Sequence, residues 1–254
     1  MASVEDRLNT LEHRLAERAR SLERAHDSRC VFTHTYALLT RQLADTLPGN
    51  AAVDAEWLTD LAEAFAERYF DALAGTELPR SWAYAFAVMK EQRTSVLEDL
   101  LFGMAVHIVH DLPLTLCDIG GGRVDGAHIA DFHAVNDVMA SSIEPIVDAT
   151  ATRYAPYVKW LDRLGGRYDN LLTDYGIRLS RGLAWYNAVR LGDERASERA
   201  RKAIDDGALH LIGDIARPPV WSVRIALRVL RWLVSFLRTW PSEATQRGMT
   251  VRAR

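Results

Sequence analysis

The stretch Leu100-Leu-Phe-Gly-Met-Ala-Val-His-Ile-Val-His-Asp-Leu-Pro113 decides the fold class of this chain. Up to Val109 it is apolar on every side of a helix apart from His107, and a helix that is hydrophobic all round is a buried central helix. Outward from it, apolar residues recur at helical spacing, and no run alternates with a period of two for long enough to form a strand. The sequence therefore predicts an all-α fold, a multi-helix bundle of about eight to nine helices around a buried central helix.

The expected organisation has three parts: an amphipathic N-terminal helix within residues 1–28, a helical core domain at 29–215, and a basic amphipathic C-terminal helix with its tail at 216–254. Turn residues separate the helices, and Asp54 and Asp125 can cap the helices that follow them. We expect helices at residues 4–26, 31–46, 54–74, 80–112, 126–155, 157–164, 168–191, 194–212 and 219–239.

The first helix carries one apolar stripe, formed by Val4, Leu8, Leu11, Leu15 and Leu22. The segment is too short to establish heptads, so the stripe favours a helix that packs on the domain over a coiled coil.

Composition limits the classes of protein to which the chain can belong. Of its 254 residues 48% are hydrophobic, which is enough for a core, and the net charge of −3 leaves no basic field for nucleic acid. Cys30 and Cys117 have no metal-type spacing and are too few for a disulfide scaffold. The N-terminus lacks the apolar region of a secretory signal, so we expect a cytoplasmic protein.

The last segment, residues 219–239, is a basic amphipathic helix. Its polar positions fall on one narrow face: Arg224, Arg228, Arg231, Ser235 and Arg238. Four arginines within about 20 residues argue against a membrane-spanning helix. The wide apolar face suits peripheral membrane contact, packing on the core, or a homodimer contact, and the sequence leaves these alternatives open.

His107 and Asp111 lie four residues apart and therefore share one face of the central helix. Buried ionisable groups need partners. The two side chains can form a hydrogen-bonded pair, share a divalent metal, or act as an acid/base pair in a cavity, in which Asp111 tunes the pKa of His107. His110 is expected to point away from this face, and Pro113 to stop or kink the helix just past the site.

The next long helix offers a second set of polar residues. Helical steps place Asp131 within its apolar arc and Asn136 at the border of that arc, so these two are expected to face inward. The same steps put three other polar residues on a solvated face: His133, Asp137 and Glu144.

The chain resembles an uncharacterised family of helical bacterial proteins, mostly actinobacterial, over roughly residues 60–190. Its members are similar in having a His-Ile-x-x-Asp-Leu-Pro segment, here 107–113, followed by an Asp-(Phe/Tyr)-x-x-Val-Asn segment, here 131–136. A later Arg…Ala-Trp segment matches Arg181 to Trp185. The resemblance points to His107, Asp111, Asp131 and Asn136, and it implies no known chemistry.

Two weaker likenesses are to known enzymes. The His-x-x-x-Asp pair is similar to those that hold metals in zinc-dependent phospholipase C and the P1-type nucleases, which are all-α hydrolases. Asn136 to Glu144 resembles the metal-binding Asn/Asp–Ser/Thr–Glu motif of class I terpene cyclases, although Ala140 occupies the middle position and no aspartate-rich partner motif lies at a suitable distance upstream.

The leading hypothesis is a helical enzyme, a metal-dependent hydrolase or a lyase/cyclase, that acts on a hydrophobic lipid-like or isoprenoid-like molecule. His107, Asp111 and Asp131 would bind a divalent metal (zinc, magnesium and iron are not distinguished) or transfer protons, and Asn136 would orient the ligand. No organic cofactor is indicated. The alternatives are a non-enzymatic binding or membrane-associated scaffold with a structural polar network, and a terpene cyclase-like enzyme.

Overall fold

The computed structural model describes residues 2–75, 78–91, 94–124, 126–156 and 174–219, together with positions 221, 224, 225, 228, 231 and 240. In these stretches every regular element is a helix, which confirms the predicted all-α class. The elements are α1 (Val4–Arg24), α2 (Cys30–Thr46), α3 (Ala55–Ala74), α4 (Arg80–Lys90), α5 (Val96–Val106), η1 (His107–Asp111), α6 (Leu112–Ile119), α7 (Ile129–Tyr154), α9 (Asp174–Leu191) and α10 (Ser197–Ala216).

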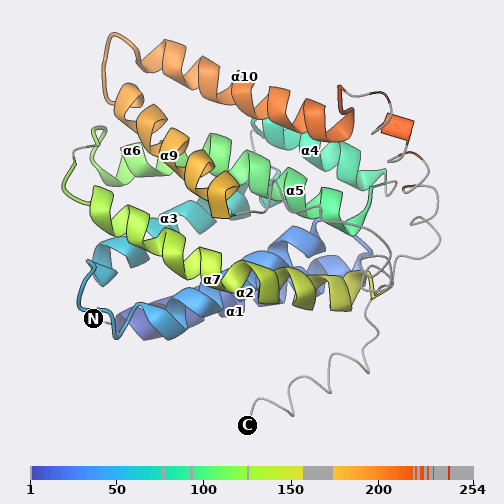
Figure 1. Ribbon diagram of the computed structural model, residues 1–254, viewed down its shortest axis with the longest axis horizontal. Coiled ribbons are helices and arrows are strands. Elements are labelled where there is room, and N and C mark those ends of the chain that lie inside the picture. Colours follow the sequence, from blue (N-terminus) through green and yellow to red (C-terminus); the bar gives the residue numbers. More distant parts are fainter. Residues whose placement is uncertain are drawn as a thin grey trace.

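The centre of the fold is the continuous helical stretch formed by α5, η1 and α6. In Figure 1, α1 and α2 lie along one side of the molecule and α10 along the opposite side, with α5 between them. α5 contacts both α2 and α10, while η1 contacts α3, α9 and α10. The stretch that decides the fold class in the sequence is therefore enclosed by helices from both halves of the chain.

This central stretch, Val96–Ile119, is long and apolar enough to cross a membrane by length and composition alone. Within the fold, however, 72% of its most apolar window is buried. That degree of burial is what the core helix of a soluble protein shows, because neighbouring helices take the place that lipid would occupy.

Helix α1 packs on the domain, as its leucine stripe predicts. Leu8, Leu11 and Leu15 are at most 2% exposed. At the far end of α1, the buried Glu23 carboxylate accepts hydrogen bonds from Arg153 Nε at 2.7 Å and Nη2 at 2.8 Å, and a third from Tyr154. A buried carboxylate thus joins α1 to the end of α7.

The expected helix at 80–112 is in fact divided. α4 ends at Lys90, and α5 begins after Ser95, whose hydroxyl accepts the backbone N–H of Glu98 while the Glu98 carboxylate accepts the N–H of Ser95. This reciprocal capping box satisfies two backbone donors at the start of a helix, and it was visible in the sequence as Ser-x-x-Glu. The single-helix prediction was wrong because no glycine or proline marks the break.

The other boundaries agree with the sequence to within a few residues. Asp54 caps α3 by accepting the backbone N–H of Trp57 at 3.0 Å, and Gly75 ends α3 with φ of 79°. Asp125, the helix expected at 157–164 and most of the segment 219–239 lie outside the described residues.

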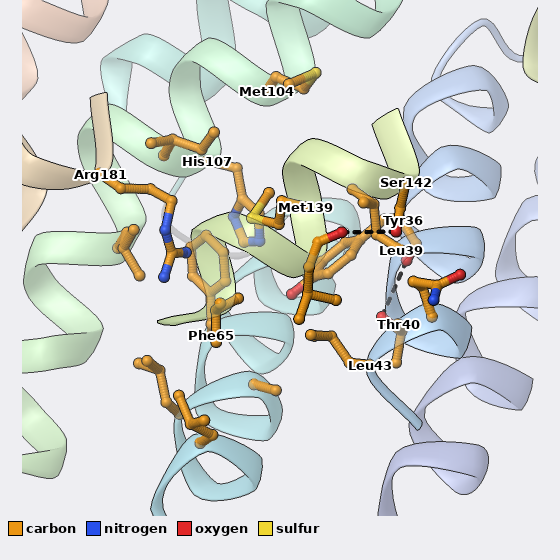
Figure 2. Close-up of a pocket in the computed structure, with 18 of the residues that line it drawn as sticks. Tyr36, Leu39, Thr40, Leu43, Phe65, Met104, His107, Met139, Ser142 and Arg181 are labelled. Carbon is orange, nitrogen blue, oxygen red and sulfur yellow. Dashed lines mark hydrogen bonds between the residues drawn. The ribbon is translucent and has the colours of Figure 1, made fainter. Parts of the chain in front are cut away.

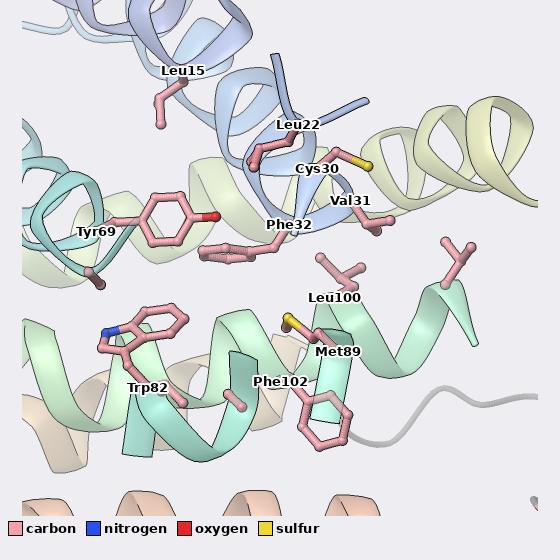
Figure 3. Packing of buried hydrophobic residues seen from close by; sticks show 14 of the residues in the cluster. Leu15, Leu22, Cys30, Val31, Phe32, Tyr69, Trp82, Met89, Leu100 and Phe102 are labelled. Carbon is pink, nitrogen blue, oxygen red and sulfur yellow. The ribbon is translucent and has the colours of Figure 1, made fainter. Parts of the chain in front are cut away.

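Gly103 marks the closest approach between α5 and α2. A Cβ atom at this position would overlap the ring of Phe32, which is 5% exposed and lies among the buried side chains of Figure 3. The ring is itself held by Tyr69 at a centroid distance of 5.0 Å and by Trp82 at 6.4 Å. The ring therefore has little room to move aside.

We expect Gly103→Ala to lower the free energy of unfolding by about 1–3 kcal/mol, because the overlap outweighs the gain in helix propensity of roughly 1 kcal/mol. The matched control is Gly207→Ala in α10, where a Cβ meets nothing within 4 Å and stability should rise. Urea unfolding followed by circular dichroism measures both changes. Equal stabilisation by both substitutions would contradict the close contact.

Candidate functional site

The centre of the candidate site is the π-helical turn η1. The backbone N–H of Leu112 bonds to the carbonyl of His107, five residues back, so this turn is wider than an α-helical one. Pro113 follows directly, and the helix continues through it as α6. Proline has no N–H and its ring crowds the carbonyl four residues earlier, so a widened turn just before it accommodates both defects. Of the two alternatives expected from the sequence, a stop or a kink, the stop is wrong, because the helix continues through Pro113.

The carboxylate of Asp111 is 2% exposed and accepts three side-chain N–H groups. Oδ2 receives Trp82 Nε1 at 2.9 Å and His107 Nδ1 at 2.8 Å, and Oδ1 receives His110 Nδ1 at 2.7 Å. Burial raises the pKa of this carboxyl, but the bonds from His107 and His110 outweigh it, and the pKa is lowered to about 2. Asp111 is therefore a buried anion held by three N–H donors.

His110 shows where sequence reasoning failed. From the sequence it was expected to point away from the face of Asp111. Its ring instead bonds to that carboxylate, and the residue is 9% exposed. The prediction used regular α-helical steps of about 100°, whereas the π turn changes the step locally.

The protonation of His107 follows from its partner. Burial lowers its pKa, and the opposing effect of the Asp111 hydrogen bond is smaller, so the ring is neutral at neutral pH. A carboxylate can only accept, so the Asp111 bond assigns the proton to Nδ1. Nε2 then carries a lone pair. This atom is buried and has no hydrogen-bond partner within the described part of the chain.

Aromatic rings fix the orientation of the His107 imidazole. Phe65 stacks on it with a centroid distance of 3.6 Å and an interplanar angle of 5°. The rings of Phe32, Tyr36 and Tyr69 lie 5.1–5.8 Å away. With Asp111 on Nδ1 and Phe65 on its face, the ring presents Nε2 in a single direction.

A cavity of about 110 Å³ adjoins His107 and lies between α2, α3, the central helix, α7 and α9. Figure 2 shows residues from these helices gathered around it. Most of its wall is apolar and includes Leu39, Leu43, Phe65, Met104, Leu112 and Met139. For scale, an apolar cavity of roughly 150 Å³ holds a benzene molecule. The space therefore suits a small apolar molecule or part of a larger one.

Only some of the polar groups along this wall are available to a ligand. The hydroxyls of Thr40 and Ser142 donate to carbonyls of their own helices at 3.0 and 2.7 Å, as the dashed lines of Figure 2 show. The Tyr36 hydroxyl is buried without a partner in the described residues. Burial and, to a smaller degree, the charge of Asp111 raise its pKa, so it stays a neutral donor.

Arg181 of α9 also lines the cavity, and it is 7% exposed. Its Nε donates to Asn136 Oδ1 at 2.6 Å and its Nη2 to the Phe132 carbonyl at 2.8 Å, while the guanidinium lies 4.1 Å from the centroid of the Phe132 ring. In the sequence, Arg181 was noted only as part of the Arg…Ala-Trp segment, and no role was predicted for it. Its spacing from the buried residues Ile177, Ala184 and Ala188 was the signal that it faces inward.

The sequence-selected residues are thus distributed over three places. His107 and Asp111 pair as expected, and Asn136, 2% exposed, holds Arg181. Asp131 lies near the start of α3, where it accepts the backbone N–H of Asp54 at 3.1 Å and faces His128 at 3.3 Å. Among the described residues, no group of three or more His, Cys, Asp or Glu side chains is placed to hold a metal ion.

The outward face predicted for α7 is confirmed, since His133, Asp137 and Glu144 are all exposed. The residues of the terpene cyclase-like motif therefore divide, because Asn136 is buried and Glu144 is not. These side chains give the terpene cyclase hypothesis no support.

Comparison with known protein families matches residues 8–218 to the model of a family of unknown function. The chain belongs to DUF5995. A search of curated proteins and a search of solved structures found no match. The DUF5995 match covers α1 to α10, so both the His107–Asp111 pair and Arg181 lie inside the family region.

We expect long-range ¹H–¹⁵N spectra at pH 7 to show His107 neutral with its proton on Nδ1. Because burial lowers its pKa below 6.5, the ring should begin to titrate only below that pH, and protonation should then destabilise the fold. The variant His107→Gln assigns the resonance. A proton on Nε2, or a midpoint above pH 6.5, would contradict the arrangement.

Proposed function

We propose that this DUF5995 protein is an enzyme that binds a small apolar molecule in the cavity and uses His107 Nε2 as a general base. One observation carries the proposal: a buried Nε2 that has no partner among the described residues lies beside an apolar cavity, in a ring whose other nitrogen is fixed by a carboxylate. Nitrogen bases in this arrangement accept protons from hydroxyl groups or water. A histidine that serves packing alone does not require an unbonded ring nitrogen beside a cavity.

The proton transfer that this geometry favours has a defined path. Nε2 takes the proton of a hydroxyl group or a water molecule, whose oxygen keeps the electron pair and becomes the nucleophile. The imidazolium that forms lies 2.8 Å from the Asp111 carboxylate, which offsets its charge. Asp111 remains ionised throughout, because its lowered pKa keeps it deprotonated.

A metal-dependent version of the function rests on the same atom. A metal bound at Nε2 would have Asp111 behind the ring on Nδ1, which is the usual way a carboxylate orients a ligating histidine. Asp111 would then support the ligand rather than coordinate the metal. Asp131 bonds instead with Asp54 and His128, so the remaining ligands would come from water or substrate.

Cytoplasmic location and peripheral membrane contact through residues 219–239 belong to the proposal as expectations from the sequence. In the non-enzymatic alternative, the hydrogen-bond network of Trp82, Asp111, His107 and His110 only fixes how the helices pack. The two readings differ in what His107 does for turnover, and stability alone does not separate them.

We expect the protein to accelerate hydrolysis of short-chain p-nitrophenyl esters, and His107→Gln to reduce kcat/KM about 100-fold or more, because glutamine keeps a donor for Asp111 but is no base. His110→Gln makes the same exchange at the other imidazole that bonds to Asp111, and His110 does not line the cavity, so this variant should lower stability comparably and turnover much less. Equal turnover in all three proteins, with only melting temperatures changed, would identify a structural network.

The metal version predicts about one divalent ion per chain after purification without chelator, and its loss in His107→Ala. Inductively coupled plasma mass spectrometry measures this. The control is His133→Ala, an exposed histidine on α7. Equal metal content in the two variants would show that His107 does not bind the metal. The general-base proposal does not require a metal and would be unaffected.

A further inference from the structure

We propose that the molecule bound in the cavity carries a carboxylate and that Arg181 is the counter-ion of that group. The inference rests on the proposed function, because it takes the cavity beside His107 as the ligand site. It adds the chemical class of the ligand, an apolar monocarboxylic acid. Arg181 becomes the residue that selects it.

The first observation is the unbalanced charge of Arg181. It is the only buried arginine in the described part of the chain, and its partners there are an amide oxygen, a carbonyl oxygen and an aromatic ring. Burial lowers its pKa only to about 10, so the guanidinium is charged at neutral pH. A buried charge without an opposite charge is costly, and a bound anion would remove that cost.

Other shielded arginines in this protein do have carboxylate partners. Arg153 makes a two-point contact with Glu23, and Arg231 bonds to Glu98 at 2.9 Å through Nε. Both of those carboxylates are at most 4% exposed. Of these three arginines, Arg181 is the one whose partners among the described residues are all neutral.

Asp111, the buried anion of the site, does not fill this role. Its oxygens are engaged by Trp82, His107 and His110, and Arg181 makes no ion pair with it in the described structure. Arg181 uses two of the five N–H groups of a guanidinium, which leaves donors for a further acceptor. A carboxylate matches the fork geometry of these donors.

The remaining polar groups of the cavity agree with a single carboxylate. The Tyr36 hydroxyl, a neutral donor that has no partner in the described part of the chain, lines the same cavity. A phosphate monoester carries nearly two negative charges and would need further cations. Among the described residues that line the cavity, Arg181 is the only cationic side chain, because His107 is neutral. The apolar wall and the volume of about 110 Å³, which is smaller than a cavity that holds benzene, suit a hydrocarbon part of about four carbons.

The experiment compares acids with neutral molecules of the same shape. Isothermal titration calorimetry of the full chain uses butanoate and pentanoate against 1-butanol and 1-pentanol. The wild-type protein should bind each acid about ten- to a hundredfold more tightly than its alcohol, the range expected for a charge-assisted hydrogen bond. Arg181→Met should abolish this preference while leaving the alcohols bound.

A matched control lies three residues earlier on the same helix. Arg178 is partly exposed and pairs with Asp137 on the surface, so Arg178→Met should keep the preference for acids. Arg181→Lys retains the charge without the planar fork and should give an intermediate preference. If Arg181→Met does not fold, the wild-type comparison and the lysine variant decide the question.

Two outcomes would overturn the inference, and they differ in what they leave standing. Equal affinity of the wild-type protein for acids and alcohols would remove the role of Arg181 but keep an apolar ligand site, and with it the proposed function. If the protein binds neither the acids nor the alcohols, the inference is overturned. The proposed function would then still be tested separately, by whether ester hydrolysis depends on His107.

Discussion

The arrangement of the site depends on one interaction, the burial of the Asp111 carboxylate among three N–H donors. An ionised carboxylate inside a protein costs several kcal/mol unless hydrogen bonds replace the lost water. Here the donors come from two elements, since Trp82 reaches in from α4 while His107 and His110 lie in η1. By taking the proton-bearing nitrogen of His107, the carboxylate also determines that Nε2 is the nitrogen left free.

The π turn is the backbone counterpart of this interaction. A regular helix brings residues four apart onto one face, which suits His107 and Asp111 but not His110. Widening the turn lets both imidazoles reach the same carboxylate, and it creates the geometry in which Pro113 continues the helix. π turns of this kind are frequent at functional sites, because an irregular backbone is retained only where its side-chain placement is useful. The π turn thus accommodates Pro113 within the helix and also positions the side chains of the site.

Helical periodicity predicted most of the fold, because a helix that buries one face carries apolar residues at helical spacing along that face. It failed at residues 91–95, where the break is encoded only by the Ser95–Glu98 capping box. For the site, spacing along one helix identified the His107–Asp111 pair. It could not identify Arg181 as a partner of Asn136, since that contact joins α9 to α7 across 45 residues. Asp131 was expected to face inward, but near the start of α7 the closest groups belong to the beginning of α3.

The two buried charges of the site differ in a way that gives the cavity its polarity. Asp111 has both oxygens engaged by donors, so little of its negative charge remains for a ligand. Arg181 has only neutral partners among the described residues and keeps unused donors, so its positive charge is the one still exposed to the cavity. A cavity with apolar walls, a free base and an uncompensated cation attracts an amphipathic anion more strongly than a neutral lipid or a cation. The sequence predicted an inward position for Asp111 only, and the three-dimensional partners of the two charges reveal which of them is satisfied.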